Sequence, residues 1–138
     1  MDFKEILKEK GIKATKTRLA VLNLLDKSDQ PLAATTIFHD LKNQKIKIDL
    51  ATIYRIIEKF IGLKIVKQVD FREGMLRYEL AGDHHHHLIC QSCGDVSSYH
   101  GECLSEVEKV IKEKYKFNVA EHVLEFFGTC DNCQKELI

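Results

Sequence analysis

The chain has 138 residues, of which 44% are hydrophobic and 30% are charged, and its formal net charge is zero. This length suffices for one ordinary domain or two small ones, and no apolar run approaches the roughly 20 residues of a membrane span. No basic and apolar signal segment opens the chain, so we expect a cytoplasmic protein without a membrane partner.

Charge is unevenly distributed along the chain. Residues 1–83 carry 16 Lys and Arg against 12 Asp and Glu, whereas residues 84–138 carry 5 against 9. A basic front half favours a polyanion partner, and an acidic back half rich in His and Cys favours cations. An imbalance of this size is also within ordinary scatter, so the motifs must decide between these interpretations.

The first half has the pattern of several short helices followed by two strands. Apolar spacing, caps and stops predict helices over residues 2–10, about 15–28, about 34–44 and 49–62. The fourth helix is the best delimited, because Asp49 is a good N-cap and Gly62 a good stop. The β-rich runs 65–69 and 75–80, separated by a turn that contains Gly, predict a hairpin.

Helices followed by a hairpin are typical of a winged helix, a variant of the helix-turn-helix domain. The fourth helix is then the recognition helix, which enters the major groove of double-stranded DNA. Its exposed face offers Thr52, Tyr54, Arg55 and Lys59. An Arg side chain recognises guanine with two hydrogen bonds, and Lys neutralises phosphate. The alternative is an ordinary solvated helix face, since many unrelated small domains share this order of elements.

The second half, beyond a short hinge at Gly82 and Asp83, has the pattern of a small β-β-α-β unit. We predict strands over residues 84–90 and 96–99, a helix over 103–115 and a third strand over 117–127. A unit of about 55 residues is too small to be robust alone. We therefore expect a metal site that stabilises this unit and a second copy of the chain that packs against it.

Two Cys-x-x-Cys pairs, Cys90 with Cys93 and Cys130 with Cys133, are separated by 36 residues. Four thiolates suit tetrahedral zinc and leave no open coordination position, so we predict a structural Zn²⁺ site. Cytoplasmic thiols stay reduced, which favours metal over disulfides. Rubredoxin-like iron and a regulatory disulfide are the alternatives. Cys103, outside either pair, is interpreted as a small apolar helix residue.

Four consecutive histidines, residues 84–87, run directly into the first Cys pair. Side chains alternate faces along a strand, so His84 and His86 point one way while His85 and His87 point the other. The run then supplies two separate sites. Imidazole with carboxylate suits Zn²⁺, Fe²⁺ or Mn²⁺. The alternative is that these histidines form a solvated polar edge.

Further ligands are sought among nearby acidic residues and the remaining histidines. Glu79, in the strand before the run, is the obvious carboxylate for the pair His85 and His87. His122, in the predicted third strand, is the natural third ligand for His84 and His86. A fourth ligand for that second site comes from one of three acidic residues: Glu102, Glu106 or Glu108. The sequence does not rank them, and we take Glu102.

With these segments in view, the chain resembles the ferric uptake regulator family over nearly its whole length. The matching segments are residues 11–19, 50–55, 78–80 and 84–94, together with His122 placed eight residues before Cys130. The resemblance implies a dimeric metal-dependent repressor with an N-terminal winged helix and a C-terminal dimerisation domain. It also implies that Lys13 reaches the minor groove while Tyr54 and Arg55 read the major groove.

The resemblance has departures that bear on the regulatory metal. Iron and peroxide sensors of the family usually have a His where this chain has Pro31 and an acidic residue where it has Ser98. His100, two residues further on, is the substitute that we expect at the hinge site. Zinc sensors lack that His and look more similar around the histidine run, although they usually carry a Cys near Glu79. These points favour zinc slightly.

Together these patterns predict an α+β protein. Residues 1–82 form a winged helix-turn-helix domain that binds DNA, and residues 83–138 form a small α/β dimerisation domain with a four-cysteine zinc site. The expected function is a homodimeric repressor of metal-uptake genes, controlled by Zn²⁺, or alternatively by Fe²⁺ or Mn²⁺. A zinc storage protein and a metalloenzyme are remote alternatives, the latter because no His-Glu-x-x-His run is present.

Overall fold

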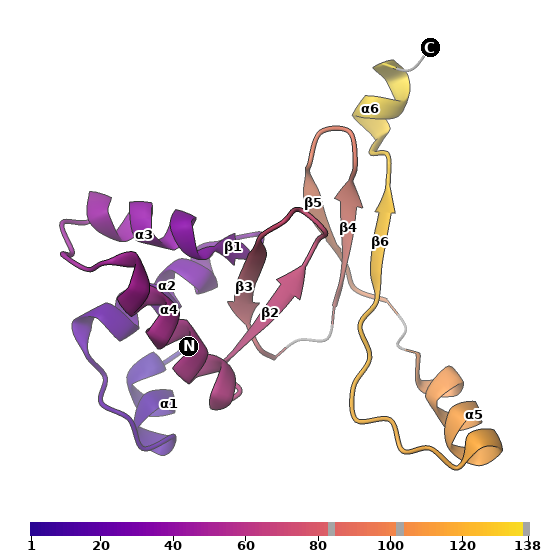
Figure 1. Ribbon diagram of the computed structural model, residues 1–138, viewed down its shortest axis with the longest axis horizontal. Helices are drawn as coiled ribbons and strands as arrows, with labels where there is room; N and C mark the ends of the chain where they lie inside the picture. Colours follow the sequence, from indigo (N-terminus) through magenta and orange to yellow (C-terminus); the bar gives the residue numbers. More distant parts are fainter. Residues whose placement is uncertain (83–84, 102–103, 137–138) are drawn as a thin grey trace. The chain divides into compact units, whose positions relative to one another are not determined.

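A computed structural model describes residues 1–82, 85–101 and 104–136. The chain divides into two compact units, Met1–Gly82 and Asp83–Ile138, and each combines helices with a small sheet (Figure 1). The protein therefore belongs to the predicted α+β class. Within the described ranges, no helix has both the length and the apolar character needed to cross a bilayer.

The first unit contains the four predicted helices. They are α1 (Phe3–Glu9), α2 (Lys16–Lys27), α3 (Ala34–Asn43) and α4 (Leu50–Gly62). Side chains cap three of them: Asp2 caps α1, Thr15 caps α2 and Asp49 caps α4. The Asp49 carboxylate accepts hydrogen bonds from the Thr52 hydroxyl at 2.6 Å and the Thr52 amide at 2.8 Å. These bonds lower the pKa of Asp49 and define where the predicted recognition helix begins.

One hydrophobic core holds the helices of this unit together. Its largest fully buried side chains are Leu7, Leu22, Ile37, Leu41, Ile53, Ile57 and Phe60. In α4, the buried residues Ile53, Ile57 and Phe60 recur at helical spacing. Burying this stripe fixes the rotation of α4 about its axis, which turns the opposite face, with Tyr54 and Arg55, towards solvent.

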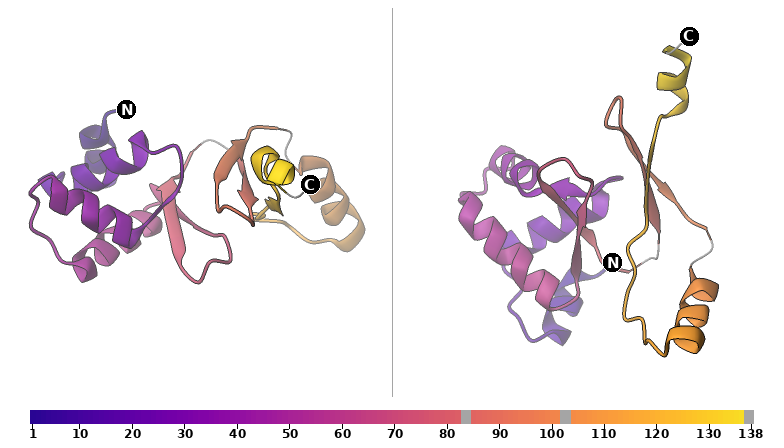
Figure 2. Two further views of the ribbon diagram at one scale, coloured as in Figure 1. Left: turned by 90° about the horizontal axis from the view of Figure 1, so that it is seen from above. Right: turned by 45° about the vertical axis from the view of Figure 1, so that its right-hand side comes forward.

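A three-stranded antiparallel sheet completes the winged helix (Figure 2). The predicted hairpin is confirmed as β2 (Val66–Asp70) and β3 (Leu76–Leu80). A third strand, β1 (Leu32–Ala33), pairs with β3 on its other side. The sequence did not predict β1, because two residues are too few to show an alternating pattern. The connection within the hairpin turns through Arg72 and Gly74, both at positive φ.

The second unit is built on a sheet with strand order β5-β4-β6. Its elements are β4 (His86–Cys90), β5 (Val96–Tyr99), α5 (Ser105–Tyr115), β6 (Glu125–Gly128) and α6 (Asp131–Glu136). The order β-β-α-β matches the prediction, and α6 is an addition. Strand β4 pairs antiparallel with β5 and parallel with β6, and the three strands lie side by side in Figure 1.

Two strand predictions for this unit were too long. Strand β4 begins at His86, and His84 lies outside the described residues. The third strand covers only Glu125–Gly128, because β4 offers four residues, His87–Cys90, as its parallel partners. Residues 116–124 are in neither helix nor strand. His122 consequently lies in an irregular segment that precedes β6.

Candidate metal centres

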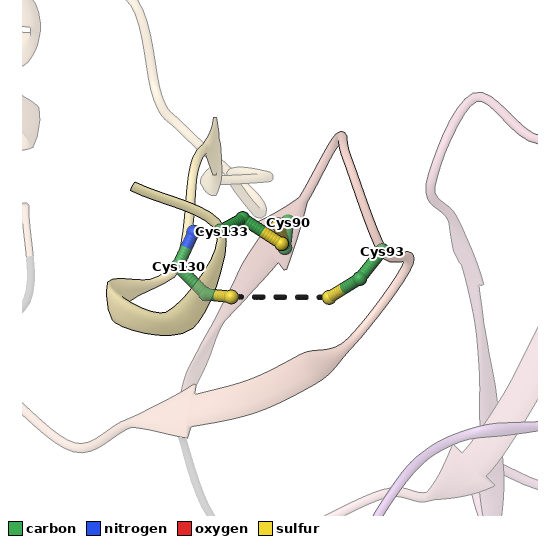
Figure 3. A group of neighbouring side chains, drawn as sticks. All are labelled: Cys90, Cys93, Cys130 and Cys133. Atoms are coloured by element: carbon green, nitrogen blue, oxygen red, sulfur yellow. Dashed lines mark hydrogen bonds between the residues drawn. The ribbon is translucent and has the colours of Figure 1, made fainter. Parts of the chain in front are cut away.

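The four paired cysteines converge at one end of the second unit (Figure 3). Cys90 ends β4, and Cys93 follows in a turn that Gly94 completes at a φ of 78°. Cys130 lies directly before α6, and Cys133 lies within that helix. All four are free thiols, and their sulfur atoms lie within 4.8 Å of one another.

The spacing of the sulfur atoms fits a tetrahedral metal ion. The Sγ atoms of Cys93 and Cys130 are 3.8 Å apart. A tetrahedral zinc with Zn–S bonds of about 2.3 Å places its sulfurs about 3.8 Å apart, far longer than a disulfide bond. Backbone N–H groups, first that of Cys130 at 3.3 Å, lower the pKa of Cys90 to about 6. This shift favours a thiolate at Cys90, the form that binds metal. The hydrogen bond with the Cys130 side chain instead raises the pKa of Cys133.

The histidines of β4 divide between the two faces of the sheet. His86 and His87 are both buried, with 3% and 1% of their surface exposed. The His86 ring packs beside Tyr99 and Phe126, at centroid distances of 6.4 and 6.5 Å. The His87 ring instead meets His85, at 4.9 Å. Strand alternation thus separates adjacent histidines into two clusters.

On the His87 face, the structure brings together three of the predicted regulatory residues and one that was not predicted. The His85 ring lies 4.9 Å from that of His87 and 5.5 Å from that of His100. The unpredicted residue is Glu125, whose Oε2 lies 2.9 Å from Nδ1 of His87. The three imidazoles are donors of the kind that Zn²⁺, Fe²⁺ and Mn²⁺ accept, and Glu125 places a carboxylate beside one of them.

On the His86 face, two of the four residues predicted for the second site, His86 and His122, belong to the described structure. The rings of His86 and His122 lie 6.0 Å apart. The carboxylate beside His122 is that of Glu108 on α5, with Oε1 at 2.6 Å from Nδ1. Glu102, the residue that the sequence analysis selected, lies outside the described residues, as does His84. Among the three acidic candidates, Glu108 is the one with a contact to a histidine in the described structure.

Glu79, the predicted carboxylate of the regulatory site, lies on β3 of the first unit. It faces Lys67 across the β2–β3 pair, and its carboxylate lies 3.2 Å from the Lys67 ammonium. Most of the Glu79 side chain is buried, whereas that of Lys67 is partly exposed. A cation that binds Glu79 would therefore compete with this ammonium.

The predicted DNA-binding residues all belong to the first unit. Tyr54, Arg55 and Lys59 are exposed on α4, and Lys13 is exposed before α2. Thr52 has a local role, because its hydroxyl donates to Asp49 in the helix cap. The exposed face of α4 thus offers two cations and an aromatic hydroxyl at helical spacing. This combination suits contacts with phosphates and base edges.

Comparison with known proteins identifies the family to which this chain belongs. The model of the ferric uptake regulator family matches residues 9–127. The chain belongs to the ferric uptake regulator family. A ferric uptake regulation protein of Neisseria gonorrhoeae is 34% identical over 130 residues, covering 93% of this chain and 90% of that protein. The peroxide-responsive repressor PerR of Staphylococcus saprophyticus is 32% identical over 128 residues, covering 93% and 86%.

A solved structure agrees with these relatives. The ferric uptake regulator of Vibrio cholerae superposes with a TM-score of 0.78 at 32% identity, covering 94% of this chain and 100% of that one. Proteins of the ferric uptake regulator family are metal-responsive transcription regulators and not enzymes. Membership therefore removes the metalloenzyme alternative.

Sequence reasoning missed one carboxylate of these clusters, Glu125, and did not select another, Glu108. Glu125 was overlooked because it lies 38 residues from His87, and no local motif joins them. The sequence offered one indication of Glu125, which is that this acidic residue directly precedes two aromatic residues of a predicted strand. Glu108 was considered but not selected, since helical spacing alone does not show which glutamate of a helix faces a distant histidine.

Proposed function

We propose that this protein is a homodimeric, cytoplasmic repressor that binds operator DNA of metal-uptake genes when its regulatory metal is bound. The observation that carries the proposal is the pairing of two separate features in one chain. The first unit is a winged helix with Tyr54 and Arg55 exposed. The second unit clusters the imidazoles of His85, His87 and His100.

The regulatory ligands in this proposal come from both units. Glu79 belongs to the first unit, and His85, His87 and His100 belong to the second. A metal ion would supply the positive charge that holds these donors together. The shared ligands would restrain the junction between the units and thereby limit the positions open to α4. A dimer reads two half-sites with its recognition helices about 34–36 Å apart, so such a restraint favours operator binding.

Two further metal assignments belong to the same proposal. Cys90, Cys93, Cys130 and Cys133 hold a structural Zn²⁺, which closes the second unit. His86 and His122, with His84 and an acidic residue, form a second site. Glu108 replaces Glu102 as the preferred carboxylate there, because of its 2.6 Å contact with His122.

Exposed apolar side chains support dimerisation through the second unit. None of the residues Ser105–Tyr115 in α5 is buried, and Val107 and Val110 each expose about half of their surface. Phe126 and Leu88 are also exposed, at neighbouring positions of β6 and β4. A second copy of the chain would cover this apolar surface, as expected for a unit too small to form a large core alone.

Two observations point to different regulatory metals. Pro31 and Ser98 replace donors expected of iron and peroxide sensors, which favours zinc. The relative from Neisseria gonorrhoeae is named for ferric uptake, which favours iron. A gel-shift titration of promoter DNA with Zn²⁺, Fe²⁺ and Mn²⁺ tests both the function and the metal. A zinc storage protein would show no metal-dependent shift with any of the three.

Replacing Tyr54 and Arg55 by Ala is expected to weaken operator binding without changing metal affinity. Each good base contact contributes about 1–3 kcal/mol, so the double variant should lose on the order of tenfold or more in DNA affinity. Fluorescence anisotropy with labelled operator measures the loss. Lys112→Ala, an exposed charge change on α5, serves as the control. Unchanged DNA affinity in the double variant would exclude α4 as the recognition helix.

A further inference from the structure

Glu125 holds His87 at two points with a single oxygen atom. Its Oε2 accepts a hydrogen bond from the His87 backbone N–H at 3.0 Å and lies 2.9 Å from the ring atom Nδ1. His87 is buried and Glu125 is largely shielded from solvent, since their side chains expose 2% and 11% of their surface. A buried carboxylate is costly unless it is hydrogen-bonded, and these two contacts supply that compensation.

The topology of the sheet places the carboxylate there. His87 lies on the central strand β4, opposite Ser98 of β5 on one side and Glu125 of β6 on the other. The neighbour on β5 is neutral, so the negative charge beside His87 within this sheet comes from β6. The parallel pairing of β4 and β6 brings it there across 38 residues of sequence.

The contact decides which ring nitrogen of His87 is available to a metal. A carboxylate oxygen only accepts, so Nδ1 carries the proton and Nε2 keeps its lone pair for a metal. The carboxylate also fixes the rotation of the ring and makes the imidazole a more basic ligand. Carboxylates that act in this way typically change metal affinity by about 10–100-fold when they are removed.

We propose that Glu125 is a positioning residue of the regulatory site, which sets the tautomer and metal affinity of His87 without itself binding the metal. This inference rests on the proposed function, in which His87 is a regulatory ligand. It adds a residue to that site from a third strand of the second unit. Strand β6 would then serve the regulatory site as well as lead into the second Cys-x-x-Cys pair.

The test uses the full-length protein with its cysteine site loaded with zinc and with His122→Ala in every protein compared, so that the second histidine site does not bind the probe. Co²⁺ then reports on the regulatory site. Glu125→Gln keeps an oxygen acceptor but removes the charge, and Glu125→Ala removes both. We expect Co²⁺ affinity to fall by about tenfold in the first variant and by up to about 100-fold in the second. The visible spectrum of bound Co²⁺ should keep its shape, because the ligands are unchanged. Glu121→Gln, exposed in the segment before β6, is the matched control and should leave the affinity unchanged.

Nitrogen NMR of the histidine rings in the metal-free protein gives a second readout. Wild-type His87 should show the tautomer protonated at Nδ1, and Glu125→Ala should shift it towards the other tautomer. A merely structural role would leave this tautomer unchanged. Affinity within twofold of wild type in Glu125→Ala would overturn the proposal, and so would an altered Co²⁺ spectrum, which would make Glu125 a ligand. Loss of zinc or of the dimer in Glu125→Gln would also overturn it.

The variant His87→Ala separates this inference from the proposed function. If His87→Ala abolishes Co²⁺ binding at the regulatory site while Glu125→Ala has no effect, His87 is a ligand and only the role of Glu125 is wrong. If His87→Ala binds Co²⁺ like the wild type, the regulatory site itself is misassigned, and the proposal for Glu125 fails with it.

Discussion

Replacing both His85 and His87 by Ala is expected to abolish metal-dependent operator binding while the dimer survives. The two rings lie 4.9 Å apart and supply two of the predicted regulatory ligands, so their loss should leave no site of useful affinity. A ligand must prefer one of two states by about 5.5 kcal/mol to move their ratio from 1:99 to 99:1. Without the two imidazoles, the metal no longer provides such a preference.

Gel shifts across a range of metal concentrations measure this loss, and analytical ultracentrifugation checks the dimer. His39→Ala is the matched control, because His39 is an exposed histidine on α3 in the first unit. The control should retain the full metal response. A double variant that still bound operator in a metal-dependent way would remove the sensor assignment from the His87 face and direct attention to His86 and His122.

Changing Cys90 to Ser is expected to remove the zinc that we propose at the cysteine site and to disrupt the second unit. A serine hydroxyl is a poor substitute for the thiolate that tetrahedral zinc requires. Metal binding and folding are coupled in small domains, and a unit of about 55 residues buries too little surface to compensate. The first unit has its own core, which includes Leu22, Ile53 and Phe60, so it should stay folded.

Zinc content per chain reports on the cysteine site, sedimentation reports on the dimer, and hydrogen exchange reports on the folding of each unit separately. The Cys90→Ser protein should be zinc-free and monomeric, with rapid exchange in β4 and β6 and protection retained in α4. Cys103→Ser, which changes the one cysteine outside a Cys-x-x-Cys pair, should keep its zinc. A stable Cys90→Ser dimer without zinc would contradict the structural role of the site.

Features with a local signal were predictable from the sequence. Helix α4 was bounded by a capping residue, Asp49, and a stop, Gly62, and the structure has it at Leu50–Gly62. The hairpin was indicated by two β-rich runs around a glycine. The cysteine cluster followed from two short motifs, since each Cys-x-x-Cys pair already holds half of a tetrahedral site.

Features that depend on long-range pairing were not predictable. Nothing local indicates that β6 runs parallel to β4, and this pairing determines that Glu125 lies beside His87. The same is true of Glu108 and His122, which lie on α5 and on an irregular segment. The third strand was overestimated because apolar, β-branched residues continue beyond the point where β4 can pair with them.

The short parallel ladder between β4 and β6 connects the cysteine cluster with the proposed regulatory site. Its pairs run from His87 with Glu125 to Cys90 with Gly128, two residues before Cys130. A slip of one residue between these strands would turn Glu125 to the opposite face of the sheet. Zinc held by Cys90 and Cys130 would prevent such a slip by fixing the offset of the strands. The cysteine site would then have to be filled before the proposed regulatory site can form, and a chain whose cysteine site is empty would not respond to its regulatory metal.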